Sequence, residues 1–276
     1  MENDAHPLPR RIPPEREKAG RRILVRGTNW LGDAVMTTPA LLRLREKFPE
    51  AHIALLTPEK LRDLWLQHPA INEVLTFAPD ENAFAVGKKL RVGKFDLALV
   101  LPNSPRSAIE TWLAGIPRRV GYARPWRNLF LTQTIAPRLD VVKMRKRSVA
   151  EIKRLVAADV NRRTSEENRA FTSAATAHQI HEYLHLAAAL GANPEPLAPQ
   201  LFVTTEEIGA AKKKFGLAKF TQPILGLNPG AEYGPAKRWP LEKFITAARK
   251  LMPDDETMNG LVRYARQMSD WEKSQR

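Results

Sequence analysis

Short apolar runs alternate with helix-patterned segments over residues 21–140, and this alternation restricts the fold more than any other feature of the chain. The first run, Ile23–Val25, ends in Gly27, and the segment that follows has its apolar residues at helical spacing. Further apolar runs follow at 52–57 and 95–101. Helices are expected between the runs over 59–67 and 84–91, and over 106–114 with Ser104 as the cap. Parallel strands joined by crossover helices satisfy this pattern, so it predicts a doubly wound α/β domain.

An acidic residue, Asp33, stands where the first expected helix begins, directly after Gly32. In an open α/β sheet, ligands bind in the crevice outside the carboxyl ends of the strands, so Asp33 is placed for chemistry there. Aspartate is also a preferred helix N-cap. The local pattern leaves both interpretations open, a chemical residue or a cap.

A second strand–turn–helix pattern begins at Pro223. Its apolar run leads into a glycine-rich turn that contains Gly230 and Lys237, and Pro240 then precedes an expected helix over 241–251. Backbone amides and basic side chains of such a turn form a cradle for phosphate. The alternative is an ordinary loop with exposed basic residues.

The chain divides into five segments by composition and pattern. The segments are a disordered leader (1–20), a Rossmann-like domain (21–140), a basic insertion (141–177), a helix and linker region (178–220) and the start of a second domain (221–276). After the basic insertion, a helix is expected over 179–191 with Gly191 as its stop, then a strand over 201–203 and a helix over 206–215.

The charge balance predicts an anionic partner. Lys and Arg number 44 against 30 Asp and Glu, which gives a net charge of +14. Nucleic acid, an acidic membrane surface and a phosphorylated substrate all fit this charge. No recognisable nucleic-acid-binding motif accompanies it, so nucleic acid is the less favoured partner, with the basic segment 143–163 as its best candidate site. The sequence contains no cysteine, so disulfides and thiolate metal sites are excluded.

The segment His181-Glu182-Tyr-Leu-His185 is a literal H-E-x-x-H motif. Two histidines at i and i+4 can bind one zinc ion, with Glu182 as general base, as in zinc proteases. Glu206 or Glu207 would be the third ligand. Matches of five residues have a high false-positive risk, so histidines on a half-exposed structural helix are the favoured interpretation.

Two segments together resemble the lipopolysaccharide heptosyltransferases of glycosyltransferase family 9, most of all the heptosyltransferase II branch. The resemblance covers roughly residues 22–140 and 178–252. The segments that carry it are Trp30–Leu42 and Asn228–Pro240, supported by Pro102–Ala108 and Ala114–Tyr122.

This resemblance implies a GT-B fold, with a complete N-terminal Rossmann-like domain for the acceptor and an incomplete C-terminal Rossmann-like domain for ADP-heptose. It implies inverting, metal-independent transfer of L-glycero-D-manno-heptose to the inner core of lipopolysaccharide, without a cofactor. The enzyme would be cytoplasmic, at the surface of the inner membrane. The family's Asp-Ser/Thr-Gly-Pro-Met-His block has no counterpart in this sequence.

The resemblance also implies roles for single residues. Asp33 corresponds to the catalytic general base, and Lys237 to the lysine that neutralises the donor diphosphate. Gly230 and Gly32 are expected beside the diphosphate. The anionic acceptor is expected at Arg106, Arg119 and Arg124, and less securely at Arg118. Because the donor-gripping block has no counterpart, a catalytically impaired remnant that only binds anionic ligands is the alternative function.

Overall fold

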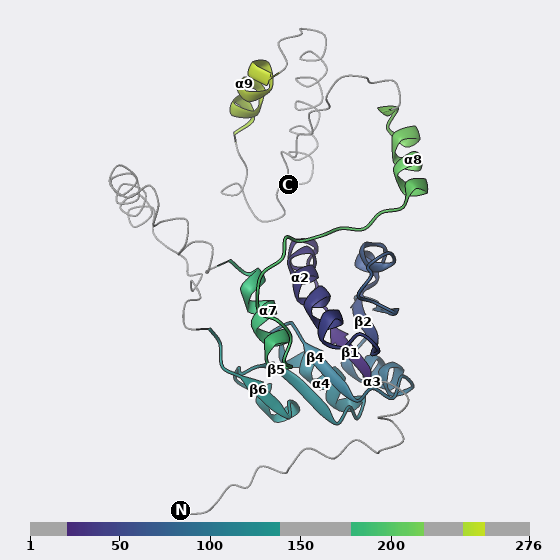
Figure 1. The fold of residues 1–276 in the computed structure, drawn as a ribbon, viewed down its shortest axis with the longest axis vertical. Helices are drawn as coiled ribbons and strands as arrows, with labels where there is room; N and C mark the ends of the chain where they lie inside the picture. The colour runs from purple at the N-terminus through teal and green to yellow at the C-terminus, as the bar shows by residue number, and fades with distance from the viewer. Residues whose placement is uncertain (1–20, 139–177, 218–239, 252–276) are drawn as a thin grey trace, which may run out of the picture. The chain divides into compact units, whose positions relative to one another are not determined.

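The computed structural model describes residues 21–138, 178–217 and 240–251. The chain forms two compact units, Met1–Thr205 and Glu206–Arg276. The first unit contains a six-stranded sheet (Figure 1). The second contains helix α9 (Leu241–Leu251) and all but the first residue of α8 (Thr205–Lys214).

All strand pairs of the sheet are parallel, and the strand order is β3-β2-β1-β4-β5-β6. This is the order of the Rossmann fold, in which the connections reverse direction between β1 and β4. The predicted doubly wound α/β domain is therefore confirmed. The strands are β1 (Arg22–Arg26), β2 (His52–Pro58), β3 (Glu73–Phe77), β4 (Leu97–Val100), β5 (Arg118–Tyr122) and β6 (Gln133–Ile135).

Helices cover both faces of the sheet. One face packs against α2 (Leu31–Lys47) and α7 (Ile180–Ala188), and the other packs against α3 (Ala83–Arg91) and α4 (Pro105–Leu113). The described part of the unit also contains two 3-10 helices, η1 (Glu59–Trp65) and η2 (Asn128–Phe130). In Figure 1, α7 lies beside α2 although they are far apart in the sequence.

The central strand β1 shows why the apolar runs form strands. Ile23 and Val25 face the core under α2 and α7, whereas Leu24 faces the core under α3 and α4. A strand buried on both faces needs apolar residues at successive positions. The exception is Arg26, the last residue of β1, which is buried on the α4 side with 1% of its surface exposed.

Helix α2 tolerates an internal proline because a neighbouring side chain replaces the missing donor. Pro39 has no N–H for the carbonyl of Val35, and the Thr38 hydroxyl donates to that carbonyl at 2.9 Å. The same hydroxyl accepts a hydrogen bond of 3.0 Å from the backbone N–H of Gln200. The helix therefore continues without a free carbonyl at this turn.

Two sequence predictions differ from the structure. The strand expected over 201–203 is wrong, because this segment has no regular structure and pairs with no described strand. Its Phe202 ring instead packs edge-on against His68, at 5.1 Å between ring centroids. The segment 59–67, expected as a helix, forms the 3-10 helix η1.

The other helices agree with expectation. Ser104 caps α4 by accepting from the backbone N–H of Ser107, and α9 has the bounds expected for it. The helix expected over 179–191 ends at Ala188, and Gly191 follows it with φ +85°. The predicted domain boundaries stay predictions, and the leader and basic insertion lie outside the described residues.

Candidate functional site

A pocket of about 240 Å³ lies at the carboxyl ends of β1, β4 and β5, the edge of the sheet where the strand order reverses. This is where ligands bind in open α/β sheets. The lining comes from three parts of the first unit, namely the turn and first helical turn after β1, the loop after β4, and a wall formed by β5 and α7. The lining residues are Thr28, Asn29, Trp30, Asp33, Leu101, Pro102, Asn103, Ser104, Tyr122, Gln179, Glu182 and Tyr183.

Asp33 lines this pocket from the first turn of α2. The N-cap position belongs to Trp30, whose side chain makes no capping hydrogen bond, so the interpretation of Asp33 as the N-cap is wrong. A carboxylate in a first helical turn is still stabilised by the helix dipole. Asp33 is therefore an acidic group that faces the pocket from the positive end of a helix.

Gln179, just before α7, orients the Asp33 carboxylate. Its Nε2 donates to Asp33 Oδ1 at 3.2 Å and to the hydroxyl of Tyr183 at 2.9 Å. Burial raises the pKa of the Tyr183 phenol, and the charge of Asp33 raises this pKa further. Tyr183 is therefore a neutral hydroxyl beside Asp33.

Tyr122 joins β5 to α7 at the pocket wall. Its hydroxyl donates to the backbone carbonyl of Glu182 at 2.7 Å, and its ring stacks on His185 at 5.9 Å with an interplanar angle of 13°. Through these contacts, Glu182 and His185 of the H-E-x-x-H segment have a structural role in packing α7 against β5. Within the described ranges, no group of three or more His, Cys, Asp or Glu residues could hold a metal ion. The zinc-protease interpretation thus gains no support from this part of the chain.

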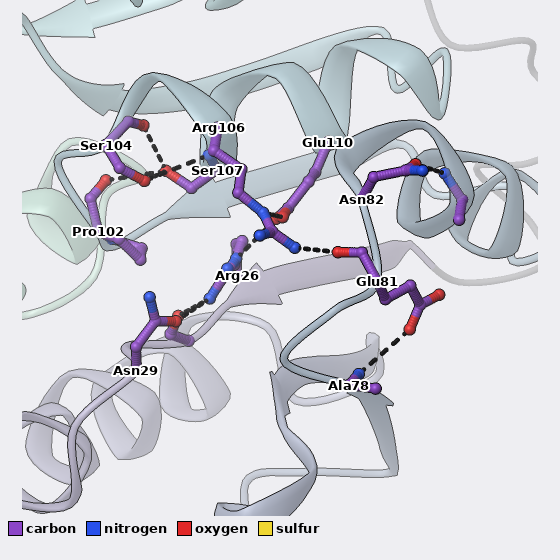
Figure 2. A network of polar contacts seen from close by, with 12 residues as sticks. Arg26, Asn29, Ala78, Glu81, Asn82, Pro102, Ser104, Arg106, Ser107 and Glu110 are labelled. Carbon is purple, nitrogen blue, oxygen red and sulfur yellow. Dashed lines mark hydrogen bonds and ion pairs between the residues drawn. The ribbon is translucent and has the colours of Figure 1, made fainter.

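A charge network joins the end of β1 to α4 (Figure 2). Arg26 Nε donates to Glu110 Oε2 at 2.9 Å, and Arg106 Nε donates to Glu110 Oε1 at 2.9 Å. The Arg26 guanidinium also lies 4.5 Å from the centroid of the Phe77 ring. From the same guanidinium, Nη1 donates to Asn29 Oδ1 at 2.8 Å. The network therefore connects α4 to the turn that lines the pocket.

The three arginines expected at the acceptor lie outside the pocket lining. Arg106 faces Glu110 and the Glu81 carbonyl, with 42% of its side chain exposed. Arg119 donates to the carbonyls of Phe130, at 2.7 Å, and Ile116, and burial lowers its pKa.

The Arg124 guanidinium lies 6.0 Å from the centroid of the ring of Tyr122, which lines the pocket. Arg118, the less secure candidate, donates to Gln133 Oε1 at 2.9 Å. Acceptor binding by these side chains stays a prediction.

Of the three residues expected at the donor diphosphate, the structure describes only Gly32. Lys237 and Gly230 lie outside the described residues. Gly32 is the second residue of α2, and a Cβ placed on it would meet no atom within 4 Å. The open space above Gly32 is compatible with the expected approach of a ligand to this backbone.

Sequence reasoning missed several polar residues of the pocket region. Asn29 and Asn103 line the pocket, and each accepts from an arginine that is almost completely buried, Arg26 or Arg127. A charged residue at the end of the apolar run Ile23–Val25 was a usable signal for Arg26. No local signal marks Arg127, because its burial depends on the fold of the loop after β5.

No described helix combines the length and the apolar character that crossing a membrane requires.

The known proteins to which this chain is similar are heptosyltransferases by name. Residues 147–255 match the family model Glycosyltransferase family 9 (heptosyltransferase). The chain is 29% identical over 246 residues to lipopolysaccharide heptosyltransferase 2 of Escherichia coli, covering 84% of this chain and 61% of that protein. It is 30% identical over 240 residues to lipooligosaccharide heptosyltransferase 2 of Haemophilus ducreyi, covering 84% and 60%. The chain thus spans about 60% of the length of these relatives.

Solved structures show the same relationship. E. coli ADP-heptose lps heptosyltransferase II matches with a TM-score of 0.60 and 28% identity, over 84% of this chain and 61% of that one. A glycosyl transferase family 9 protein from Veillonella parvula matches with a TM-score of 0.64 over 88% of this chain and 66% of that one. At 21% identity the latter supports the fold alone. The resemblance inferred from the sequence is confirmed by both kinds of comparison.

Proposed function

We propose that this chain, as a relative of the glycosyltransferase family 9 heptosyltransferases, transfers L-glycero-D-manno-heptose from ADP-heptose to the inner core of lipopolysaccharide. The observation that carries the proposal is the position of Asp33 in a pocket at the topological switch point of a Rossmann-like sheet. Relatives named as heptosyltransferases support the substrate class. The acceptor is an anionic glycolipid, which fits the net charge of +14 and action at the cytoplasmic surface of the inner membrane.

In the proposed reaction, Asp33 is the general base. The carboxylate takes the proton of an acceptor hydroxyl while that oxygen forms a bond to the anomeric carbon of the donor heptose. The bond between the anomeric carbon and the diphosphate oxygen breaks, and its electron pair leaves with ADP. Attack on the face opposite the leaving group inverts the anomeric configuration. The step requires no metal or cofactor when basic groups neutralise the diphosphate.

The environment of Asp33 supports this role. Gln179 holds one carboxylate oxygen at 3.2 Å, and the neutral Tyr183 hydroxyl is the second partner of the same amide. Electrostatic stabilisation of the leaving ADP is assigned to Lys237, with the backbone at Gly230 and Gly32 beside the diphosphate. Arg106, Arg119 and Arg124 are proposed to attract the anionic parts of the acceptor.

A second candidate function is that of a remnant which binds anionic ligands without catalysis, and the net charge of +14 is compatible with it. The two functions differ in turnover. Under the remnant function, the pocket binds an acceptor but ADP is not released.

The test is acceptor-dependent release of ADP from ADP-heptose with a heptosyl-Kdo2-lipid A acceptor. Asp33→Asn should reduce the rate by roughly 10²- to 10⁴-fold, the usual contribution of a general base. Asp63→Asn is the matched control, because Asp63 has a side chain that is 90% exposed and lies on η1 outside the pocket lining. Turnover that Asp33→Asn leaves unchanged would refute the assigned base. No turnover by the folded chain would favour the remnant function.

A further inference from the structure

Two buried arginines hold the two asparagines of the pocket in a defined orientation. Arg26 Nη1 donates to Asn29 Oδ1 at 2.8 Å, and Arg127 Nη1 donates to Asn103 Oδ1 at 3.3 Å. The two arginines have exposed fractions of 1% and 0%. A guanidinium group has only N–H donors, so the atom of each asparagine that faces it must be the amide oxygen.

The consequence is that the amide nitrogens are available on the other side of each asparagine. Asn29 and Asn103 both line the pocket. Figure 2 shows the Asn29 nitrogen on the side of the amide away from Arg26. The pocket therefore has N–H donors from its two loops and a carboxylate acceptor from Asp33.

Two further features define the chemistry that this arrangement recognises. Thr28 lines the pocket with 6% of the residue exposed, and its hydroxyl is buried and has no hydrogen-bond partner among the described residues. No lysine or arginine of the described ranges lines the pocket. Asparagine amides, hydroxyl residues and the acidic residues Asp33 and Glu182 match the hydroxyl groups of an uncharged sugar ring better than a phosphate.

The buried position of Arg127 lowers the stability of the fold. It is completely buried, and its Nε and Nη2 have no hydrogen-bond partner within the part of the chain that the structure describes. Burial and, to a smaller extent, the charge of Arg124 together lower the pKa of Arg127 to about 10, so the group remains charged near neutral pH. A buried charge without a carboxylate partner destabilises a protein. Its contact with Asn103 is the one that reaches the pocket.

We propose that Arg26 and Arg127 are positioning residues that orient Asn29 and Asn103, and that this pocket recognises the neutral hydroxyl groups of the acceptor sugar beside Asp33. The inference rests on the proposed function, because the sugar is taken to be the acceptor heptose. It deepens that function by separating two tasks. The pocket binds the sugar ring, and the arginines outside its lining bind the anionic groups of the acceptor.

The test measures binding of methyl L-glycero-D-manno-heptoside to the full chain by ligand-observed NMR, without donor and without turnover. Asn29→Asp and Asn103→Asp keep an oxygen for each arginine but replace the N–H donor that faces the pocket. Each should weaken binding about 10-fold, as expected for an unsatisfied buried polar group. Asn193→Asp is the matched control, since its Oδ1 accepts from the Glu195 N–H at 2.9 Å outside the pocket lining.

Arg127→Met separates positioning from a structural role. Positioning predicts heptoside binding about 3- to 10-fold weaker, with a melting temperature equal to or above that of the parent chain, because a buried unpaired charge has been removed. A lower melting temperature with unchanged binding would overturn the proposal for Arg127. Binding unaffected by both asparagine variants, displacement of the heptoside by inorganic phosphate, or no heptoside binding by the parent chain would overturn the sugar site. Heptoside binding without ADP release would leave this inference standing while refuting the catalytic function.

Discussion

Removing the charge of Glu110 should destabilise the first unit strongly. Glu110 has a side chain with no exposed surface, and it pairs with Arg26, whose side chain is 2% exposed. Glu110→Gln keeps the shape but leaves the Arg26 guanidinium buried without a carboxylate. Breaking a buried ion pair in this way costs about 3–5 kcal/mol. Since whole domains are stable by about 5–15 kcal/mol, this is a large share of the stability.

The loss of stability in Glu110→Gln should come mainly from Arg26, because Arg106 is much more exposed. Arg106 has a side chain that is 42% exposed, so water can solvate it when Glu110 is neutral. Arg106→Gln should therefore cost less than about 1 kcal/mol. Replacing both members of the buried pair, in Arg26→Met with Glu110→Leu, should recover most of the stability that Glu110→Gln loses, because apolar side chains of similar size need no counter-charge.

Urea unfolding followed by circular dichroism measures these differences, and the melting temperature should fall by roughly 2–4 °C for each kcal/mol. Glu46→Gln is the matched control, because this carboxylate is 52% exposed and pairs with Arg43 on the surface of α2. The reasoning fails if Glu110→Gln and Glu46→Gln have equal effects. It also fails if the apolar double variant is as unstable as Glu110→Gln.

Two other predictions concern stability. Burial lowers the pKa of His68 to about 4, below the value near 6.5 of the unfolded chain, so the unfolding free energy should fall as the pH drops from 6.5 towards 4, by roughly 2 kcal/mol at pH 5. His68→Gln should remove this part of the pH dependence, and equal slopes for both proteins in urea titrations from pH 7.5 to 5 would contradict the cause. Gly87→Ala should destabilise by about 1–3 kcal/mol despite the better helix propensity of alanine, because its Cβ would lie 2.5 Å from Leu113 Cβ between α3 and α4. Gly32→Ala, where a Cβ meets no atom within 4 Å, should leave the melting temperature within about 2 °C, and equal losses would refute the packing argument.

Much of the fold could be predicted from local pattern. Strands such as β1 are buried on both faces, so their residues Ile23–Val25 form a continuous apolar run that is visible in the sequence. The position of Asp33 in the pocket also followed from local order, because a residue at the start of the helix after β1 must lie near the carboxyl end of that strand.

The rest of the site depends on contacts between distant parts of the chain. Gln179 reaches Asp33 only because α7 packs along α2, and no local pattern specifies which helix face α7 covers. Arg26 is buried because Glu110, 84 positions away, supplies its counter-charge. Arg106 shares this carboxylate, and its binding to a ligand stays a prediction.

The packing of α7 against α2 has a consequence for dividing this protein into parts. A fragment that ends near residue 140, the boundary that the sequence pattern predicts, would contain all six strands of the sheet. It would nevertheless lack Gln179 and Tyr183, and the apolar surface of α2 that α7 covers would meet water. Such a fragment should aggregate. The smallest part that keeps this core and the pocket lining together therefore extends at least through Ala192, which is buried in the same core as Leu190.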